Sequence, residues 1–125
     1  MNRKTLDFYI PSINYILEVQ NSDGSIPWEK GKKLDPWDHV EACMGLSIAG
    51  KKDEAEQAFL WLSDNQLEDG SWYSEYLKSI PQTKRRETNF SAYIATGLMH
   101  HYLIFRDKDF LENLYPTLSK AIDFV

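Results

Sequence analysis

The sequence is poor in features that would place it outside the cell or on a nucleic acid. It has one cysteine, Cys43, so an intrachain disulfide is excluded. Basic residues are in deficit, with 14 Lys and Arg against 19 Asp and Glu, which argues against a nucleic-acid partner. Residues 1–15 contain no apolar segment of the kind found in secretory signals. Together these absences predict a cytoplasmic protein.

No apolar segment is well suited to a lipid bilayer either. Residues 88–105 contain no Lys, Arg, Asp or Glu, and their length approaches that of a membrane-spanning helix. The same segment holds polar side chains, among them Asn89, Thr96, His100 and His101. These are acceptable in a helix buried in protein and unfavourable in lipid, so we expect a buried helix and no transmembrane segment.

The spacing of apolar residues predicts helices, and no segment alternates cleanly enough to predict a strand. Residues 6–19 carry an apolar stripe that predicts a first helix. Pro11 either interrupts this helix or marks its true start. Asp35 and Pro36 have the residue types of an N-cap and a first helical position, and Gly50 is suited to end that second helix.

Three further helical segments follow. Asp53 and Glu56 stand in capping-box spacing and predict the start of a third helix. Residues 88–105 form the fourth. After a turn at residues 106–109 we expect a short helix and then another that begins at Pro116.

These helices are of two kinds. The first, third and last are amphipathic, whereas the second has only Asp38 and Glu41 as charges after its cap, and the fourth has none. A helix that is apolar on every side has to be covered on every side. Two concentric rings of helices produce this alternation, whereas a simple antiparallel bundle makes every helix amphipathic. We therefore expect an all-α fold, an α/α toroid, of which residues 1–125 form one partial domain of about five helices.

The phrase Gln-x-x-Asp-Gly-Ser begins at Gln20 and again at Gln66. This offset of 46 residues is typical of helix-pair repeats, and residues 116–125 have the pattern that starts a third copy. Repeat arrays need several units to bury their faces, so we infer a fragment whose partner is the remainder of the toroid. An enzyme needs a catalytic group once, whereas a repeat protein needs a connecting turn at every helix pair. The repetition therefore favours a structural role for the phrase, as a joint between successive helices.

Residues 61–72 resemble the QW repeat of squalene–hopene cyclases, in which an aromatic and an aliphatic residue precede a Gln, a Gly and a Trp. The basic residue that often begins that repeat is absent here. The segments DPWDHVEACMGL and TNFSAYIATGLMHHYL are similar to the amino-terminal third of bacterial proteins of the prenyltransferase/squalene-cyclase repeat superfamily.

This resemblance implies an α/α toroid that acts on an apolar isoprenoid or a diphosphate-bearing small molecule. It also implies that Gln66 caps the next helix, that Trp72 stacks over its amide, and that Gly70 makes the turn. The catalytic motifs Asp-x-Asp-Asp and Asp-Asp-x-x-Asp are absent from the sequence. The resemblance therefore points to fold more than to reaction.

The candidate catalytic residues are Asp38, His39 and Glu41, which follow the loop at residues 20–34. Asp38 and Glu41 are three residues apart and share a helix face. Paired carboxylates there are suited to acid–base catalysis, or to holding a cation together with His39. The alternative is that acids in a first helical turn only stabilise the helix dipole.

Candidate substrate-binding residues lie in or beside the two long loops and near the start of the fourth helix. Arg85 and Arg86 precede the free backbone N–H groups of the fourth helix and are candidates for a diphosphate, although such runs are more often solvated. The other candidates are side chains suited to line a pocket or stabilise a cation, namely Trp28, Trp37, Tyr76, Asn89 and Tyr93.

No metal site and no cofactor is assigned from the sequence. The adjacent pair His100 and His101 lacks the spacing that puts two ligands on one helix face, and we expect one of the two to be a hydrogen-bonded interior residue. Cys43 has no basic partner in view and is interpreted as a small buried residue.

Three functions stay open at this point. The first is a prenyltransferase or terpene-cyclase-like toroid. The second is a six-hairpin carbohydrate-active domain, in which Asp38 or Glu41 works with a later carboxylate and loop aromatics stack on sugars. The third is a non-catalytic helical-repeat binding module, which the absent motifs favour.

Overall fold

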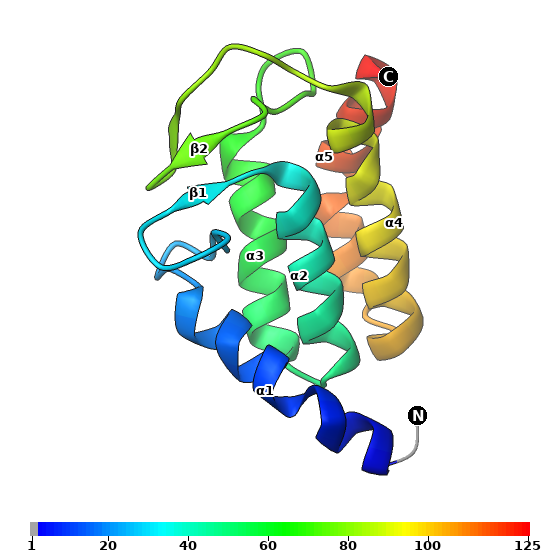
Figure 1. The fold of residues 1–125 in the computed structure, drawn as a ribbon. Helices are drawn as coiled ribbons and strands as arrows, with labels where there is room; N and C mark the ends of the chain where they lie inside the picture. The colour runs from blue at the N-terminus through cyan, green and yellow to red at the C-terminus, as the bar shows by residue number, and fades with distance from the viewer. Residues whose placement is uncertain (1–2) are drawn as a thin grey trace.

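The computed structural model describes residues 3–125. They form five helices and three short strands (Figure 1): α1 (Arg3–Val19), β1 (Lys33–Leu34), α2 (Pro36–Ile48), α3 (Lys52–Asn65), β2 (Tyr76–Leu77), β3 (Ile80–Pro81), α4 (Thr88–Phe105) and α5 (Lys108–Phe124). The all-α class and the five helices are thereby confirmed, whereas closure into a toroid stays a prediction.

The helices lie in two layers. α2 and α4 pack side by side, α3 lies behind α2, and α5 lies behind α4 (Figure 1). Gly97 lets α4 approach α2 closely, because a Cβ at that position would lie 2.5 Å from Cγ1 of Val40. α4 is not covered on every side within residues 3–125, since Met99 and Leu103 are each 53% exposed.

A small antiparallel sheet joins the two long loops at the end of the molecule where α2 and α4 begin. Its strand order is β1-β2-β3, with Leu34 opposite Tyr76 and Leu77 opposite Ile80. The prediction of no strand is therefore wrong. Each strand has two residues, which is too short to show the alternation that reveals a strand in a sequence.

Some helix boundaries also differ from those expected. Pro11 lies inside α1, and Pro116 lies inside a continuous α5, so two separate final helices were the wrong prediction. A proline removes one helical hydrogen bond, and packing along a long amphipathic helix offsets that loss. Asp53 is wrong as a cap because α3 begins before it and has no side-chain cap. Asp35 caps α2 as predicted, accepting the N–H of Asp38 at 2.9 Å.

The repeated phrase forms the same turn twice. Oδ1 of Asp23 accepts the backbone N–H of Ser25 at 3.0 Å and its hydroxyl at 2.5 Å. Oδ1 of Asp69 accepts the corresponding groups of Ser71 at 3.1 and 2.6 Å. These matched hydrogen bonds confirm that the phrase is a structural joint.

The glutamine of each joint holds it to the second helix that follows in the chain. Nε2 of Gln20 donates to the carbonyls of Gly24 and Glu54, the latter in α3. Nε2 of Gln66 donates likewise to Gly70 and to Thr117 in α5.

Thr117 lies in the middle of its helix, so the expectation that Gln66 caps the next helix is wrong. Trp72 donates its indole N–H to the carbonyl of Leu62 at 2.9 Å, which fastens the loop to the end of α3.

Candidate functional site

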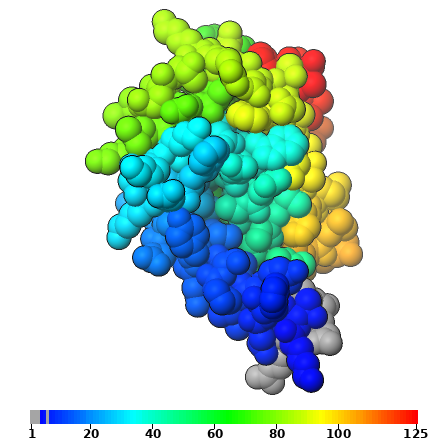
Figure 2. Space-filling view, in the orientation of Figure 1, coloured from blue at the N-terminus to red at the C-terminus, as the bar shows by residue number. Residues whose placement is uncertain are grey.

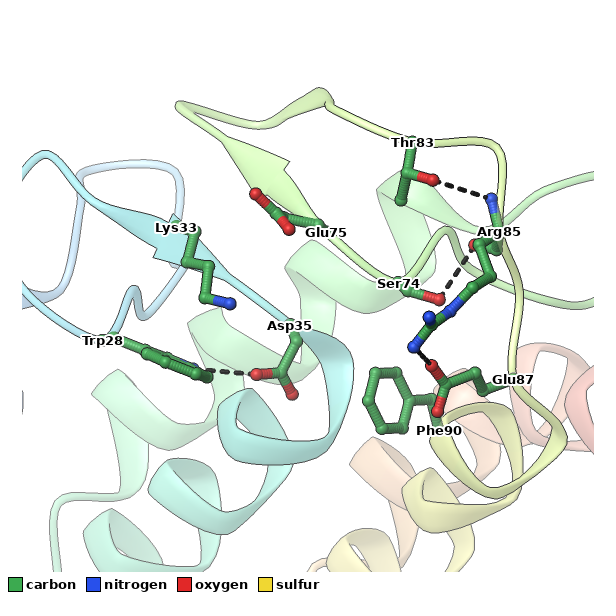
Figure 3. Close-up of a pocket in the computed structure, with 9 residues that line it drawn as sticks. All are labelled: Trp28, Lys33, Asp35, Ser74, Glu75, Thr83, Arg85, Glu87 and Phe90. Carbon is green, nitrogen blue, oxygen red and sulfur yellow. Dashed lines mark hydrogen bonds and ion pairs between the residues drawn. The ribbon is translucent and has the colours of Figure 1, made fainter.

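A cavity of about 280 Å³ opens where the two long loops meet the first turns of α2 and α4 (Figure 3). The segments that bring these walls together, residues 20–35 and 66–87, lie next to each other on the left side of the space-filling view, the second above the first (Figure 2). The lining of the cavity combines acidic, basic, hydroxyl-bearing and aromatic side chains, namely Trp28, Lys33, Asp35, Ser74, Glu75, Thr83, Arg85, Glu87 and Phe90.

Trp28 and Asp35 form one wall of this cavity. The indole Nε1 of Trp28 donates to Oδ2 of Asp35 at 2.8 Å, and Oδ1 of the same carboxylate caps α2. Nζ of Lys33 lies 4.0 Å from the centroid of the Trp28 ring. Trp28 is still 48% exposed, so its ring offers surface to a ligand at the rim.

Asp38 lies in the first turn of α2, where its side chain is half-buried. Burial raises the pKa of this carboxyl, and the neighbouring charges of Asp35 and Glu41 raise it further. A carboxyl group of raised pKa holds its proton to higher pH than an ordinary aspartate. This direction is the one that suits a general acid, and the catalytic assignment of Asp38 stays a prediction.

Glu41 bridges α2 and α4 through two aromatic residues. Its Oε1 accepts the indole N–H of Trp37 at 2.9 Å and the hydroxyl of Tyr93 at 3.3 Å. The rings of Trp37 and Tyr93 stack with centroids 3.8 Å apart and an angle of 4° between their planes. Burial and the Glu41 charge raise the pKa of Tyr93. Asn89 is exposed in the first turn of α4, on the same end of the molecule.

His39 is fully buried beside this group. The backbone N–H of Ile26 donates to Nδ1 at 3.1 Å, so Nε2 carries the ring proton and donates to the carbonyl of Ala58 at 2.8 Å. Burial lowers the pKa of His39 to about 4. Backbone groups thus occupy both ring nitrogens, and the ring positions the loop that carries Trp28.

Tyr76, the first residue of β2, is also buried and does not contribute to the lining of the cavity. Its hydroxyl accepts the backbone N–H of Tyr73 at 3.0 Å. Its ring meets Trp61 edge-to-face at 5.2 Å. The structure therefore places Tyr76 in the core that supports the second loop.

The two arginines each face a carboxylate. Arg85 pairs with Glu87 and Arg86 pairs with Asp69. The guanidinium of Arg86 also lies 6.0 Å from the ring centroid of Phe124. Each guanidinium therefore has an acid as its neighbour, and the role of the two arginines in substrate binding stays a prediction.

Asp38, Glu41 and the other candidates on α2 and α4 are not among the side chains that line the cavity. Two further residues discussed from the sequence, His101 and Cys43, are buried. His101 is buried, with Nδ1 2.9 Å from the hydroxyl of Ser47 and Nε2 3.3 Å from Glu56, which confirms the expected interior histidine. Cys43 is fully buried, and burial raises the pKa of its thiol.

Two kinds of feature are absent from residues 3–125. No group of three or more His, Cys, Asp or Glu in this range is arranged to hold a metal ion. No helix in the range combines the length and hydrophobicity needed to cross a bilayer.

Sequence reasoning missed several residues that line the cavity. They are Lys33, Ser74, Glu75, Thr83, Glu87 and Phe90. The pairing of β1 with β2 brings residues 74 and 75 next to residues 33–35. Strands of two residues are too short to leave a periodic pattern in the sequence, so the sequence does not predict that these residues lie together.

No protein-family model matches the chain. The chain is similar to an MMP endo-(1,4)-3-O-methyl-alpha-D-mannosidase of Mycolicibacterium hassiacum, with 43% identity over 110 residues. The match covers 88% of this chain and 31% of the relative, so the chain spans about a third of the length of the protein it matches.

This similarity corrects the identification drawn from the QW-like segment. The relative is named as a mannosidase, so the assignment to the prenyltransferase and squalene-cyclase superfamily is wrong, and so is the isoprenoid or diphosphate substrate. The structure supplies the reason. Gln66, Gly70 and Trp72 make a packing joint between helices, and a joint of this kind carries no information about a reaction.

Proposed function

We propose that this chain forms part of the substrate cleft of an endo-acting glycoside hydrolase for 1,4-linked, 3-O-methylated α-mannose chains. The observation that carries the proposal is the 43% identity to a mannosidase of that name over 88% of the chain. Because the chain spans 31% of the relative, the activity of a whole enzyme is itself part of the proposal.

The chemistry of the cavity supports a carbohydrate ligand. Sugars present hydroxyl groups at their edges and C–H groups on their faces, and they are held by polar side chains placed beside aromatic rings. Trp28 and Phe90 supply rings at this cavity, and Lys33, Glu75 and Glu87 supply groups that hydrogen-bond to hydroxyls. The stacked pair of Trp37 and Tyr93 provides a second aromatic surface between α2 and α4.

Asp38 is the residue to which we assign the general acid. Hydrolysis of a glycosidic bond needs one carboxyl group that protonates the leaving oxygen and a second, ionised carboxylate on the other side of the sugar. The raised pKa of Asp38 suits the first role. We place the second carboxylate in the part of the relative's length that this chain does not span.

A chimera provides the test. This chain replaces the matching segment of the Mycolicibacterium hassiacum mannosidase, and the substrate is a synthetic α-1,4-linked oligosaccharide of 3-O-methylmannose. We expect the chimera to release shorter fragments, detected by mass spectrometry. We expect Asp38→Asn in the chimera to lower the rate by about 10²–10⁴-fold.

The control is Asp64→Asn, because Asp64 is an exposed acid on α3; this variant should keep the rate of the unmodified chimera. A folded chimera that leaves the oligosaccharide intact would contradict the proposed function.

A further inference from the structure

A second cavity of about 280 Å³ lies between α1, the first loop and α2. We name it the apolar pocket. Its walls are the side chains of Ile16, Val19, Ile26, Pro27 and Ala42. Its chemistry contrasts with that of the cavity in Figure 3, which is lined by charged and hydroxyl-bearing side chains as well as rings.

Trp28 links the two cavities, because it contributes to the lining of both. Its backbone carbonyl accepts the hydroxyl of Tyr15 at 3.0 Å, which fixes the rim of the apolar pocket to α1. Among residues 3–125, Asp38 is the one carboxylate in the lining of the apolar pocket. A ligand in this pocket is therefore held directly beside the group to which we assign the general acid.

We propose that the apolar pocket binds the edge of a sugar ring that carries a methyl ether, and that it selects O-methylated over unmethylated mannose. This inference rests on the proposed function and names the subsite for its substrate. A free hydroxyl entering this pocket would lose hydrogen bonds to water and find few polar partners there. A methyl ether has no donor to desolvate and gains burial of apolar surface.

The size and position of the pocket fit this role. Its volume exceeds that of a methyl group and accommodates one edge of a pyranose together with its O-methyl substituent. A sugar edge placed there brings the adjoining glycosidic oxygen toward Asp38. Recognition of the methyl ether and delivery of the proton are thus assigned to neighbouring parts of one site.

The test is saturation-transfer NMR on the 125-residue chain with two probes of equal length. One is a tetrasaccharide of α-1,4-linked 3-O-methylmannose and the other is α-1,4-mannotetraose. We expect the O-methyl protons to receive the strongest saturation in the first probe. We also expect the unmethylated probe to bind at least about 10-fold more weakly, which is the degree to which an apolar pocket distinguishes ligands that differ by one methyl group.

Two variants of Ala42 fix the location of the effect. Ala42→Leu fills the pocket and should abolish the preference for the methylated probe, whereas Thr96→Leu, on the exposed face of α4, should preserve it. Ala42→Ser serves if the leucine variant does not fold. The serine hydroxyl offers a hydrogen-bond partner to a free sugar hydroxyl with little change in side-chain volume. The preference for the methylated probe over the unmethylated one should therefore become smaller.

The outcomes separate the inference from the function on which it rests. If both probes bind equally, or if Ala42→Leu weakens both equally, the carbohydrate site stands and the methyl-selective pocket is overturned. If neither probe binds, the proposed function falls and the inference falls with it.

Discussion

The indole N–H of Trp28 donates to Oδ2 of Asp35 at 2.8 Å, while Oδ1 of the same carboxylate caps α2. One buried side chain thus fixes both the start of the helix that carries Asp38 and the ring at the rim of the cavity. The position of the proposed acid and the position of the aromatic surface are therefore coupled through Asp35.

This coupling predicts different effects for two variants of Trp28. Trp28→Phe keeps a ring but leaves Oδ2 of Asp35 without its donor, so the free energy of unfolding should fall by about 1–2 kcal/mol. Sugar binding should change little, since an aromatic face remains. Trp28→Ala should weaken binding about 10-fold or more. Urea unfolding and NMR titration measure the two quantities, and a phenylalanine variant that binds as poorly as the alanine variant would contradict the assignment.

The two joint glycines should be far less replaceable than a third glycine of similar backbone angle. A Cβ at Gly24 would lie 2.2 Å from the carbonyl oxygen of Gln57, and one at Gly70 would lie 2.0 Å from that of Lys120. Gly31 has a φ of +73°, but a Cβ there would meet no atom within 4 Å. We expect Gly24→Ala and Gly70→Ala each to destabilise the chain by about 3 kcal/mol or more, against about 1 kcal/mol for Gly31→Ala.

Thermal and urea unfolding of the three glycine variants measure these differences. Equal destabilisation by all three substitutions would show that backbone angle alone matters. That result would contradict our explanation that glycine is needed at both positions because the turn lies so close to a helix.

Because His39 is buried in its neutral form, we expect the free energy of unfolding to fall in mild acid. The pKa of His39 in the folded chain is about 4, below the ordinary value of 6.5, so the unfolded chain binds the proton more readily. The contribution of His39 is complete above about pH 6.5 and is lost as the pH falls toward 4. Between about pH 7 and 4.5 the free energy of unfolding should drop by roughly 2–3 kcal/mol through this residue.

The matched variant is His39→Gln, whose amide can accept from Ile26 and donate to Ala58 without titrating. Urea unfolding of both proteins across this pH range isolates the histidine contribution. Parallel stability curves for the two proteins would contradict the proposed titration of His39.

Local patterns predicted much of the fold. The Asp35 cap follows from residue types at adjacent positions, and the repeated joint follows from a repeated phrase. The continuous α5 could not be predicted, because packing along α5 offsets the hydrogen bond lost at Pro116 and leaves no local trace.

The candidate site was predicted less well. Asp38 and Glu41 could be singled out as acids sharing a helix face, but the wall opposite depends on the pairing of Leu34 with Tyr76, which residues so far apart in the sequence do not reveal. The first functional assignment failed for a related reason. Gln66 and Trp72 serve packing, and packing does not specify chemistry.

The most direct measurement of the central claim compares Asp38→Asn with the unmodified chimera on two substrates. One is the 3-O-methylmannose oligosaccharide, and the other is its 2,4-dinitrophenyl glycoside, whose leaving group departs without a proton. If Asp38 is the general acid, the variant should lose about 10²-fold or more on the first substrate and far less on the second. Equal losses on both substrates would contradict the assignment of Asp38 and with it the proposed catalytic cleft.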